Sequence, residues 1–129
     1  MIRYNAKISV MKKQAGVWID YEKAVIFILA NEGAEIKRVR SGLNVGVQPF
    51  STTGNERGAG TPGKSYYDEV ISYIRAAESI LIFGPGEAKL ELKKRLEDLE
   101  LEDRIVGMET VFKMTDNEIV TKVRQRFIK

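Results

Sequence analysis

The chain has 129 residues, of which 43% are hydrophobic and 30% charged, and this favours one globular domain with its own core. It contains no cysteine, which excludes disulfides and thiolate chemistry, and no histidine, which removes the commonest general base and metal ligand. The net charge of +3 is too small to establish a polyanionic partner by itself. Any metal would need oxygen ligands, and no cofactor is predicted.

Residues 1–14 carry four basic side chains and no acidic one. They lack the apolar core and cleavage site of a signal peptide, so we interpret them as a basic, flexible extension. Met1 and Met11 are both compatible with the natural start. No stretch approaches the roughly 20 apolar residues that cross a bilayer. We therefore expect a cytoplasmic protein without a membrane partner.

Two apolar segments, residues 16–20 (GVWID) and 23–30 (KAVIFILA), are rich in β-branched and aromatic residues. Their two-residue separation predicts an antiparallel hairpin. After a turn, residues 34–40 (AEIKRVR) mix apolar and charged side chains, as a protected edge strand does. Residues 41–65 follow with six of the eleven glycines and two of the three prolines. That composition predicts a long, flexible functional loop.

The second half of the chain alternates helical and strand patterns. Ser65, with Asp68 three residues later, predicts an N-cap for a helix over 66–77. Residues 79–83 (SILIF) predict a strand buried on both faces. A helix over 87–100 with Leu99 on its apolar stripe, a strand over 104–111 and a last helix follow. Thr115 and Glu118 predict a capping box for that last helix.

The predicted order of elements is three strands, then helix, strand, helix, strand, helix. Hairpin connections and right-handed crossovers turn this order into a five-stranded mixed sheet, strand order 3-2-1-4-5, with helices on both faces. This is the ribonuclease H-like α/β three-layer sandwich. We expect one such domain over 15–129, with the Gly-rich insertion at 41–65.

A nuclease of this architecture needs several carboxylates around paired divalent ions. Asp20 ends the first strand, where the first ligand would lie, but the strand over 79–83 has no acid. Asp68, Glu69 and Glu109 are surface residues with no enforced convergence. We interpret Asp20 as a hairpin-turn residue, and we predict no metal site and no dependence on divalent metal.

The turn Gly84-Pro85-Gly86 lies between a strand and a helix, where free N–H groups favour an anion. It matches neither phosphate-binding glycine motif, and Pro85 has no N–H to donate. A turn whose glycines allow close packing is the simpler interpretation. Gly84, Gly86 and Lys89 are therefore weaker candidates for RNA contact.

Aromatic and basic side chains give further candidates for nucleic-acid contact. Trp18, Phe27 and Phe83 lie in apolar strands and are expected in the core, whereas Tyr66 and Tyr67, beside the loop, are the stacking candidates. Residues 104–129 carry six basic against three acidic side chains. The weaker basic candidates on the last helix are Lys122, Arg124 and Arg126.

From residue 15 to 128 the chain resembles a known family. The segments GVWIDYEKAVIFIL, ILIFGPGEAKLELKKRL and IVGMETVFKMTDNEIVTKVR, with the Gly-rich insertion between the first two, carry the resemblance. The chain looks like the middle domain of archaeal and eukaryotic class 1 peptide-chain release factors and Pelota, and most closely like their single-domain bacterial relatives. The resemblance implies a ribonuclease H-like fold without metal catalysis, used at the ribosome or on tRNA.

In release factors this insertion carries a Gly-Gly-Gln tip that promotes peptidyl-tRNA hydrolysis. Here Gly58-Ala59-Gly60 is followed by Thr61, and the only glutamine of the loop, Gln48, lies elsewhere. We therefore expect a non-catalytic module that binds ribosome or tRNA through the loop and basic surface. The candidate RNA-contact residues of the loop are Arg57, Gly58, Gly60 and Lys64.

Two alternatives stay open. One is a hydrolase, acting either on peptidyl-tRNA through the loop or as a metal-dependent nuclease through Asp20. The other is a protein-interaction module that adds a strand to the edge formed by residues 34–40.

Overall fold

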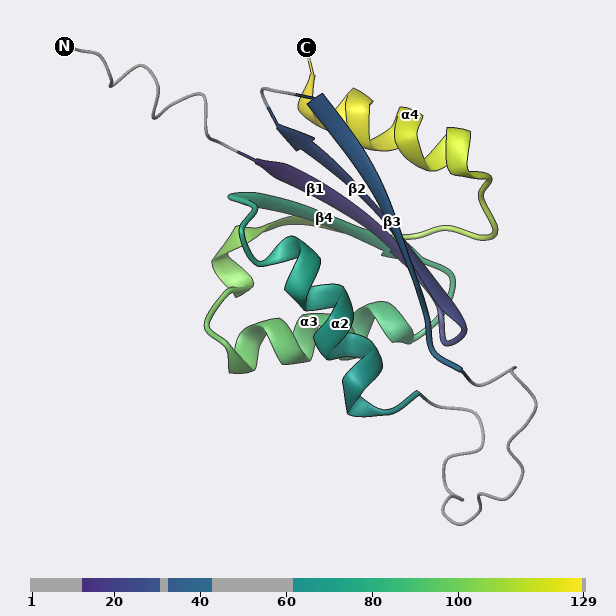
Figure 1. The fold of residues 1–129 in the computed structure, drawn as a ribbon, viewed down its shortest axis with the longest axis vertical. Coiled ribbons are helices and arrows are strands. Elements are labelled where there is room, and N and C mark those ends of the chain that lie inside the picture. The colour runs from purple at the N-terminus through teal and green to yellow at the C-terminus, as the bar shows by residue number, and fades with distance from the viewer. Residues whose placement is uncertain (1–12, 31–32, 43–61, 129) are drawn as a thin grey trace, which may run out of the picture.

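A computed structural model describes residues 13–30, 33–42 and 62–128 (Figure 1). The elements, in chain order, are β1 (Gln14–Ile19), β2 (Lys23–Ala30), β3 (Gly33–Arg40), α2 (Lys64–Ile74), β4 (Ser79–Gly84), α3 (Ala88–Asp98), the 3-10 turn η2 (Glu102–Arg104), β5 (Ile105–Thr110) and α4 (Asp116–Phe127). Within these residues no helix is long and apolar enough to cross a membrane.

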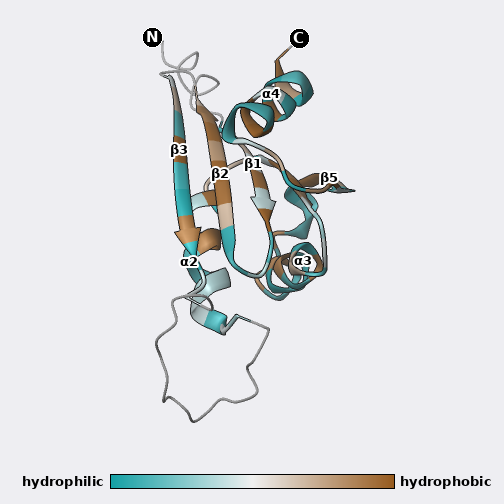
Figure 2. Ribbon diagram, turned by 90° about the vertical axis from the view of Figure 1, so that its right-hand side faces the viewer, coloured by the Kyte–Doolittle hydropathy of each residue, from teal (hydrophilic) through white to brown (hydrophobic). Residues whose placement is uncertain are grey.

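The strands form one sheet in the order β3-β2-β1-β4-β5. β1 pairs antiparallel with β2 and β2 with β3, whereas β4 runs parallel to both β1 and β5. The predicted α/β fold and strand order are therefore confirmed. Figure 2 shows the contrast between the predominantly hydrophobic β2 and the mixed β3 at the sheet edge.

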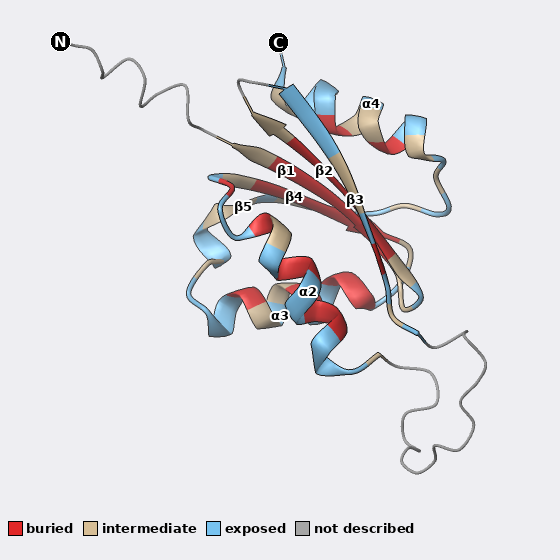
Figure 3. Cartoon of the chain, in the orientation of Figure 1, coloured by how far each residue is buried: buried red, intermediate tan, exposed pale blue. Residues whose placement is uncertain are grey.

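The sheet is covered by α2 and α3 on one face and by α4 on the other (Figures 1 and 3). Side chains alternate between the faces along each strand, so Val17 and Ile19 pack towards α2 and α3 while Trp18 packs towards α4. A Cβ atom on Gly16 would lie 2.2 Å from Cγ2 of Val123. The absence of a side chain at Gly16 is what lets α4 approach the sheet so closely.

The first helix begins earlier than predicted. Gly63, not Ser65, is the N-cap of α2, and no side chain caps its N–H groups, so the expected Ser65 cap is wrong. Tyr66 and Tyr67 are both buried in the first turn of α2. Their burial favours a helix that already includes Lys64 and Ser65, which the sequence pattern assigned to the loop.

The end of α3 corrects the predicted apolar stripe. Ala88, Leu92 and Leu96 are buried, but Leu99 is 46% exposed. Glu100 has a left-handed φ of 61°, and the N–H of Leu101 donates to the carbonyl of Leu96 at 2.8 Å. This Schellman-type end reverses the chain and turns Leu101, instead of Leu99, against the core.

The predicted start of the last helix is confirmed. The Thr115 hydroxyl accepts from the N–H of Glu118, and the Glu118 carboxylate accepts from the N–H of Thr115. This capping box satisfies two N–H groups that the helix would otherwise leave without partners.

Candidate nucleic-acid interface

Most of the sequence-predicted candidates that are described lie at one end of the strands, and this end forms the edge of the sheet from which the connections to the helices leave. β1, β3 and β4 run in the same direction and end there, and α2 and α3 begin there. In α/β sheets the carboxyl ends of the strands are the usual place for a ligand. Residues 40–42 and 62–64, at the two ends of the Gly-rich segment, also lie at this edge.

Asp20 shapes the turn at this edge. Its Oδ1 accepts hydrogen bonds from the backbone N–H groups of Glu22, at 2.8 Å, and Lys23, at 2.9 Å. The predicted hairpin-turn role is confirmed. Asp68 and Glu69 are exposed on α2, and Glu109 pairs with Lys122 at 2.5 Å. Within the described residues no three acidic side chains are close enough to hold a metal ion.

The groups of the turn between β4 and α3 that could contact a ligand are mostly used in contacts within the protein. A Cβ atom on Gly84 would lie 2.1 Å from the carbonyl oxygen of Ile19, so glycine allows β1 and β4 to meet there. Lys89 is only 8% exposed, and its ammonium donates to the carbonyl of Gly86 at 2.6 Å. Gly86 itself faces open space. In this geometry Lys89 fastens the turn to the helix and offers little charge to solvent.

The two tyrosines beside the loop are core residues, so the expectation that they are available for stacking on bases is wrong. Tyr66 is 3% exposed and Tyr67 2%. The Tyr66 hydroxyl donates to the carbonyl of Asp20 at 2.8 Å. Burial, followed by the nearby charge of Asp20, raises the pKa of Tyr66. Burial of the two aromatic rings against the sheet is more favourable than leaving the hydroxyl groups in water.

Tyr67 is buried without a partner for its hydroxyl among the described residues. Burial, with Glu91 as the next cause, raises the pKa of Tyr67 to about 12. The Arg95 guanidinium lies 5.2 Å from the centre of its ring and acts in the opposite direction. Both tyrosines therefore stay neutral at physiological pH and serve packing.

The three basic candidates on α4 have partners within the chain. Lys122 forms the ion pair with Glu109 and also lies 5.8 Å from the ring centre of Phe83. Arg124 lies 5.4 Å from the ring centre of Phe27. Arg126 donates to the backbone carbonyl of Val106 at 2.9 Å. An RNA ligand would compete with these contacts.

Of the candidates on the loop, Arg57, Gly58 and Gly60 lie outside the described residues. Lys64 is described as the exposed first residue of α2. It lies at the sheet edge from which the Gly-rich segment leaves.

Sequence reasoning missed a cluster of cations on the α4 face. Lys23, Arg38 and Arg40 line a hollow of about 250 Å³ together with Asp116. The signal was present in the alternation of residues 34–40, because Arg38 and Arg40 are two apart and share one face of a strand. The sequence pattern alone explains these charges as protection of an edge strand.

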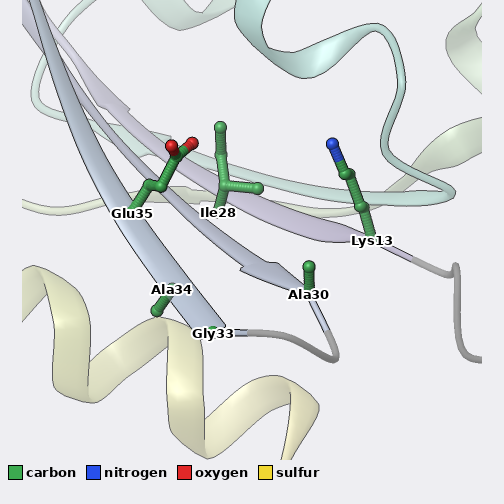
Figure 4. Close-up of a pocket in the computed structure, with 6 residues that line it drawn as sticks. All are labelled: Lys13, Ile28, Ala30, Gly33, Ala34 and Glu35. Atoms are coloured by element: carbon green, nitrogen blue, oxygen red, sulfur yellow. The ribbon is translucent and has the colours of Figure 1, made fainter.

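A second hollow, of about 290 Å³, lies near the opposite end of β2 and β3 (Figure 4). Lys13 and Glu35 stand on either side of Ile28 and Ala30, and all four side chains point to the same side of the sheet (Figure 4). Among the described residues, one cation and one carboxylate line it, and these two charges balance. This hollow is less suited to a polyanion than the one beside α4.

Comparison with solved structures identifies the fold. Pelota from Archaeoglobus fulgidus matches with a TM-score of 0.59 and 16% identity over 95% of this chain and 33% of that chain. Thermoplasma acidophilum Pelota matches with a TM-score of 0.60 and 19% identity, covering 89% of this chain and 32% of that chain. An archaeal translation termination factor, aRF1, gives 0.57 and 14%, covering 91% and 35% respectively.

The chain therefore has an α/β fold shared with Pelota and an archaeal termination factor, and the resemblance expected from the sequence is confirmed for the fold. The chain spans about a third of the length of these proteins. No protein-family model and no curated protein sequence matches it.

Proposed function

We propose that the chain is a non-catalytic, cytoplasmic module of translation that binds the ribosome or tRNA through the Gly-rich segment and its basic surface. The observation that carries the proposal is the fold, which two Pelota proteins and a translation termination factor share over about nine-tenths of this chain. Two of these proteins are Pelota and the third is a translation termination factor, and this chain corresponds to about a third of each.

The structure around the Gly-rich segment supports a role in presenting it. At the start of the segment, the N–H of Ser41 donates to the carbonyl of Glu22 at 2.9 Å. After it, the hydroxyl of Tyr66 donates to the carbonyl of Asp20 at 2.8 Å. Both flanks are thus tied to the same β1–β2 turn. A rigid base of this kind is how folds hold binding loops in place.

The sequence of the segment supports binding without hydrolysis. By the sequence resemblance, Gly58-Ala59-Gly60-Thr61 corresponds to the Gly-Gly-Gln tip of a release factor and lacks its glutamine. Arg57 and Lys64 supply positive charge for phosphate contacts, which position a protein on RNA without reading its bases. We expect binding that depends strongly on salt and no hydrolysis of peptidyl-tRNA.

Binding to purified ribosomes and to tRNA, measured by co-sedimentation and by filter binding from about 50 to 200 mM salt, tests the proposal. Affinity should fall by roughly 0.7 to 0.9 logarithmic units per phosphate contact for each tenfold rise in salt. Arg57→Ala with Lys64→Ala should weaken binding and flatten this slope. Arg75→Ala with Lys94→Ala removes the same charge from the exposed surfaces near the end of α2 and on α3, and should change binding less.

A folded protein that binds neither ribosomes nor tRNA at about 50 mM salt, where charge attraction is strong, would overturn the proposal. The protein-interaction alternative would then lead. It rests on β3, which is an edge strand of the sheet and leaves a row of backbone groups for an added strand. Cross-linking from Glu35 or Lys37 positions to a protein partner would favour that alternative.

A further inference from the structure

The hollow beside α4 brings three cations together from two strands. Lys23 and Arg40 are directly opposite each other in the β2–β3 pairing, and Arg38 is opposite Val25. Since Val25 packs in the cluster under α4, all three basic side chains belong to the α4 face. They meet around a space of about 250 Å³.

The charge in this hollow is unbalanced. Arg38 is paired with Asp116 at the start of α4, the one carboxylate among the described residues that line the hollow. Within the described part of the chain no carboxylate pairs with Lys23 or Arg40. Three cations against one carboxylate leave an excess of two positive charges, which favours an anion with several oxygen acceptors, such as a phosphate.

An exposed aromatic residue is connected to this hollow through Trp18. Phe112 is 79% exposed, more than any other large hydrophobic residue described. Its carbonyl accepts a hydrogen bond from Nε1 of Trp18 at 3.1 Å, and the ammonium of Lys23 lies 5.8 Å from the Trp18 ring centre. Trp18 therefore links the Phe112 backbone to the rim of the hollow. Proteins that bind unpaired nucleotides combine cationic surfaces, which contact the backbone, with exposed aromatic rings, which stack on the bases.

We propose that the hollow lined by Lys23, Arg38 and Arg40 binds a backbone phosphate of unpaired RNA, while Phe112 stacks on a base of the same strand. The inference rests on the proposed function because the partner is again RNA. It adds a second contact surface, on the α4 face of the sheet, which does not involve the Gly-rich segment. Stacking and phosphate contacts tolerate any base, so the contact has no sequence preference.

The test uses a fluorescein-labelled single-stranded RNA of twelve mixed pyrimidines, with anisotropy recorded from about 50 to 200 mM salt. Lys23→Ala with Arg40→Ala should lower affinity at least tenfold and reduce the salt slope by roughly 0.7, the contribution of one phosphate contact on a single strand. Arg38 is retained in this variant because it pairs with Asp116. Arg75→Ala with Lys94→Ala is the control of equal charge.

Phe112→Ala tests the stacking contact separately. It should lower affinity about fivefold or more and leave the salt slope unchanged, because an aromatic ring displaces no counterions. Fluorescence of Trp18, the only tryptophan, and thermal unfolding check that each variant is folded. If the double variant unfolds, Arg40→Glu alone tests the same site at an exposed position.

Equal losses in the Lys23/Arg40 and Arg75/Lys94 variants would overturn the phosphate site. Unchanged binding by Phe112→Ala, or equal affinity for duplex and single-stranded RNA, would overturn the stacking contact. If ribosome binding depends on Arg57 and Lys64 but not on the hollow, this inference fails while the proposed function stands. If the wild-type protein binds neither RNA nor ribosomes, both fail.

Discussion

The two faces of the sheet are covered in different ways. On one face α2 and α3 seal a largely aliphatic core that also includes Tyr66 and Tyr67. On the other face α4 is the covering helix, and the strand aromatics beneath it each have a cation near the ring. These pairs are Lys23 with Trp18, Lys122 with Phe83 and Arg124 with Phe27.

The difference shows that positive charge has two uses on the α4 face. Long basic side chains lay their methylene stems along apolar surface and keep the charge in water. Lys122 and Arg124 add to the cover that α4 provides over the sheet. The cations around the hollow outnumber the one carboxylate described there, so their excess charge is available to a ligand. A count of basic residues along the chain does not separate these uses.

The largest expected loss of stability comes from shortening one buried isoleucine on each face of the sheet. Ile71 of α2 and Ile119 of α4 are both almost fully buried. Ile71→Ala should cost about 2 to 5 kcal/mol, and Ile119→Ala should fall at the low end of that range. The reason is that α4 packs on its face without a neighbouring helix and is freer to move into the space. Urea unfolding measures both, and an equal or larger loss for Ile119→Ala would contradict the difference between the faces.

Gly16→Ala sharpens the comparison at the contact between β1 and α4. The added Cβ would lie 2.2 Å from Cγ2 of Val123, so α4 must move outwards, at a cost of about 1 to 3 kcal/mol. Val123→Ala removes the opposing methyl groups. In the double variant the loss should therefore be smaller than the sum of the single losses, by thermal or urea unfolding. Strict additivity would show that the helix does not press on Gly16.

The two tyrosines on the α2 and α3 face should respond differently to loss of the hydroxyl. Tyr66→Phe removes the hydrogen bond to the carbonyl of Asp20 and should cost about 1 kcal/mol. Tyr67→Phe removes a buried hydroxyl that has no described partner, and it should be neutral or stabilising. Each variant is the control for the other because both keep the ring. A clear loss in Tyr67→Phe would reveal a partner for that hydroxyl.

Alkaline pH should lower the free energy of unfolding through Tyr67 on this same face. The pKa of Tyr67 is about 12 in the folded chain against an ordinary value of 10, because burial disfavours the phenolate. The unfolded chain therefore releases this proton first, and stability should fall as pH rises from about 10 towards 12. Tyr67→Phe should remove part of that fall in urea unfolding at pH 9 to 12. An identical pH dependence in wild type and variant would assign the effect to other groups.

The smallest expected loss of stability comes from removing a basic side chain that lies over an aromatic ring on the α4 face. Arg124→Ala should cost about 0.5 to 1 kcal/mol, since the guanidinium lies near the Phe27 ring and its stem covers apolar surface. Lys94→Ala, at an exposed position on α3, is the matched control and should change stability by less than about 0.5 kcal/mol. Equal effects in thermal unfolding would show that Arg124 covers nothing of consequence.

The local features were predictable because they depend on neighbours in the sequence. Residue alternation and turn lengths located the strands, and handedness rules then defined the sheet order. The capping box at Thr115 and Glu118 follows from a spacing of three residues, and Asp20 bonds to N–H groups within three residues. The capping box was identified from the sequence with the correct partners, and Asp20 with the correct turn role.

Only the tertiary structure decided which side chains are free to meet a ligand. Tyr66 and Tyr67 are buried in the core because α2 packs on the sheet. Lys23, Arg38 and Arg40 come together because β2 and β3 pair in one register and α4 brings Asp116 beside them. Exposure and convergence are sums over contacts distant in the sequence, and no local pattern records them.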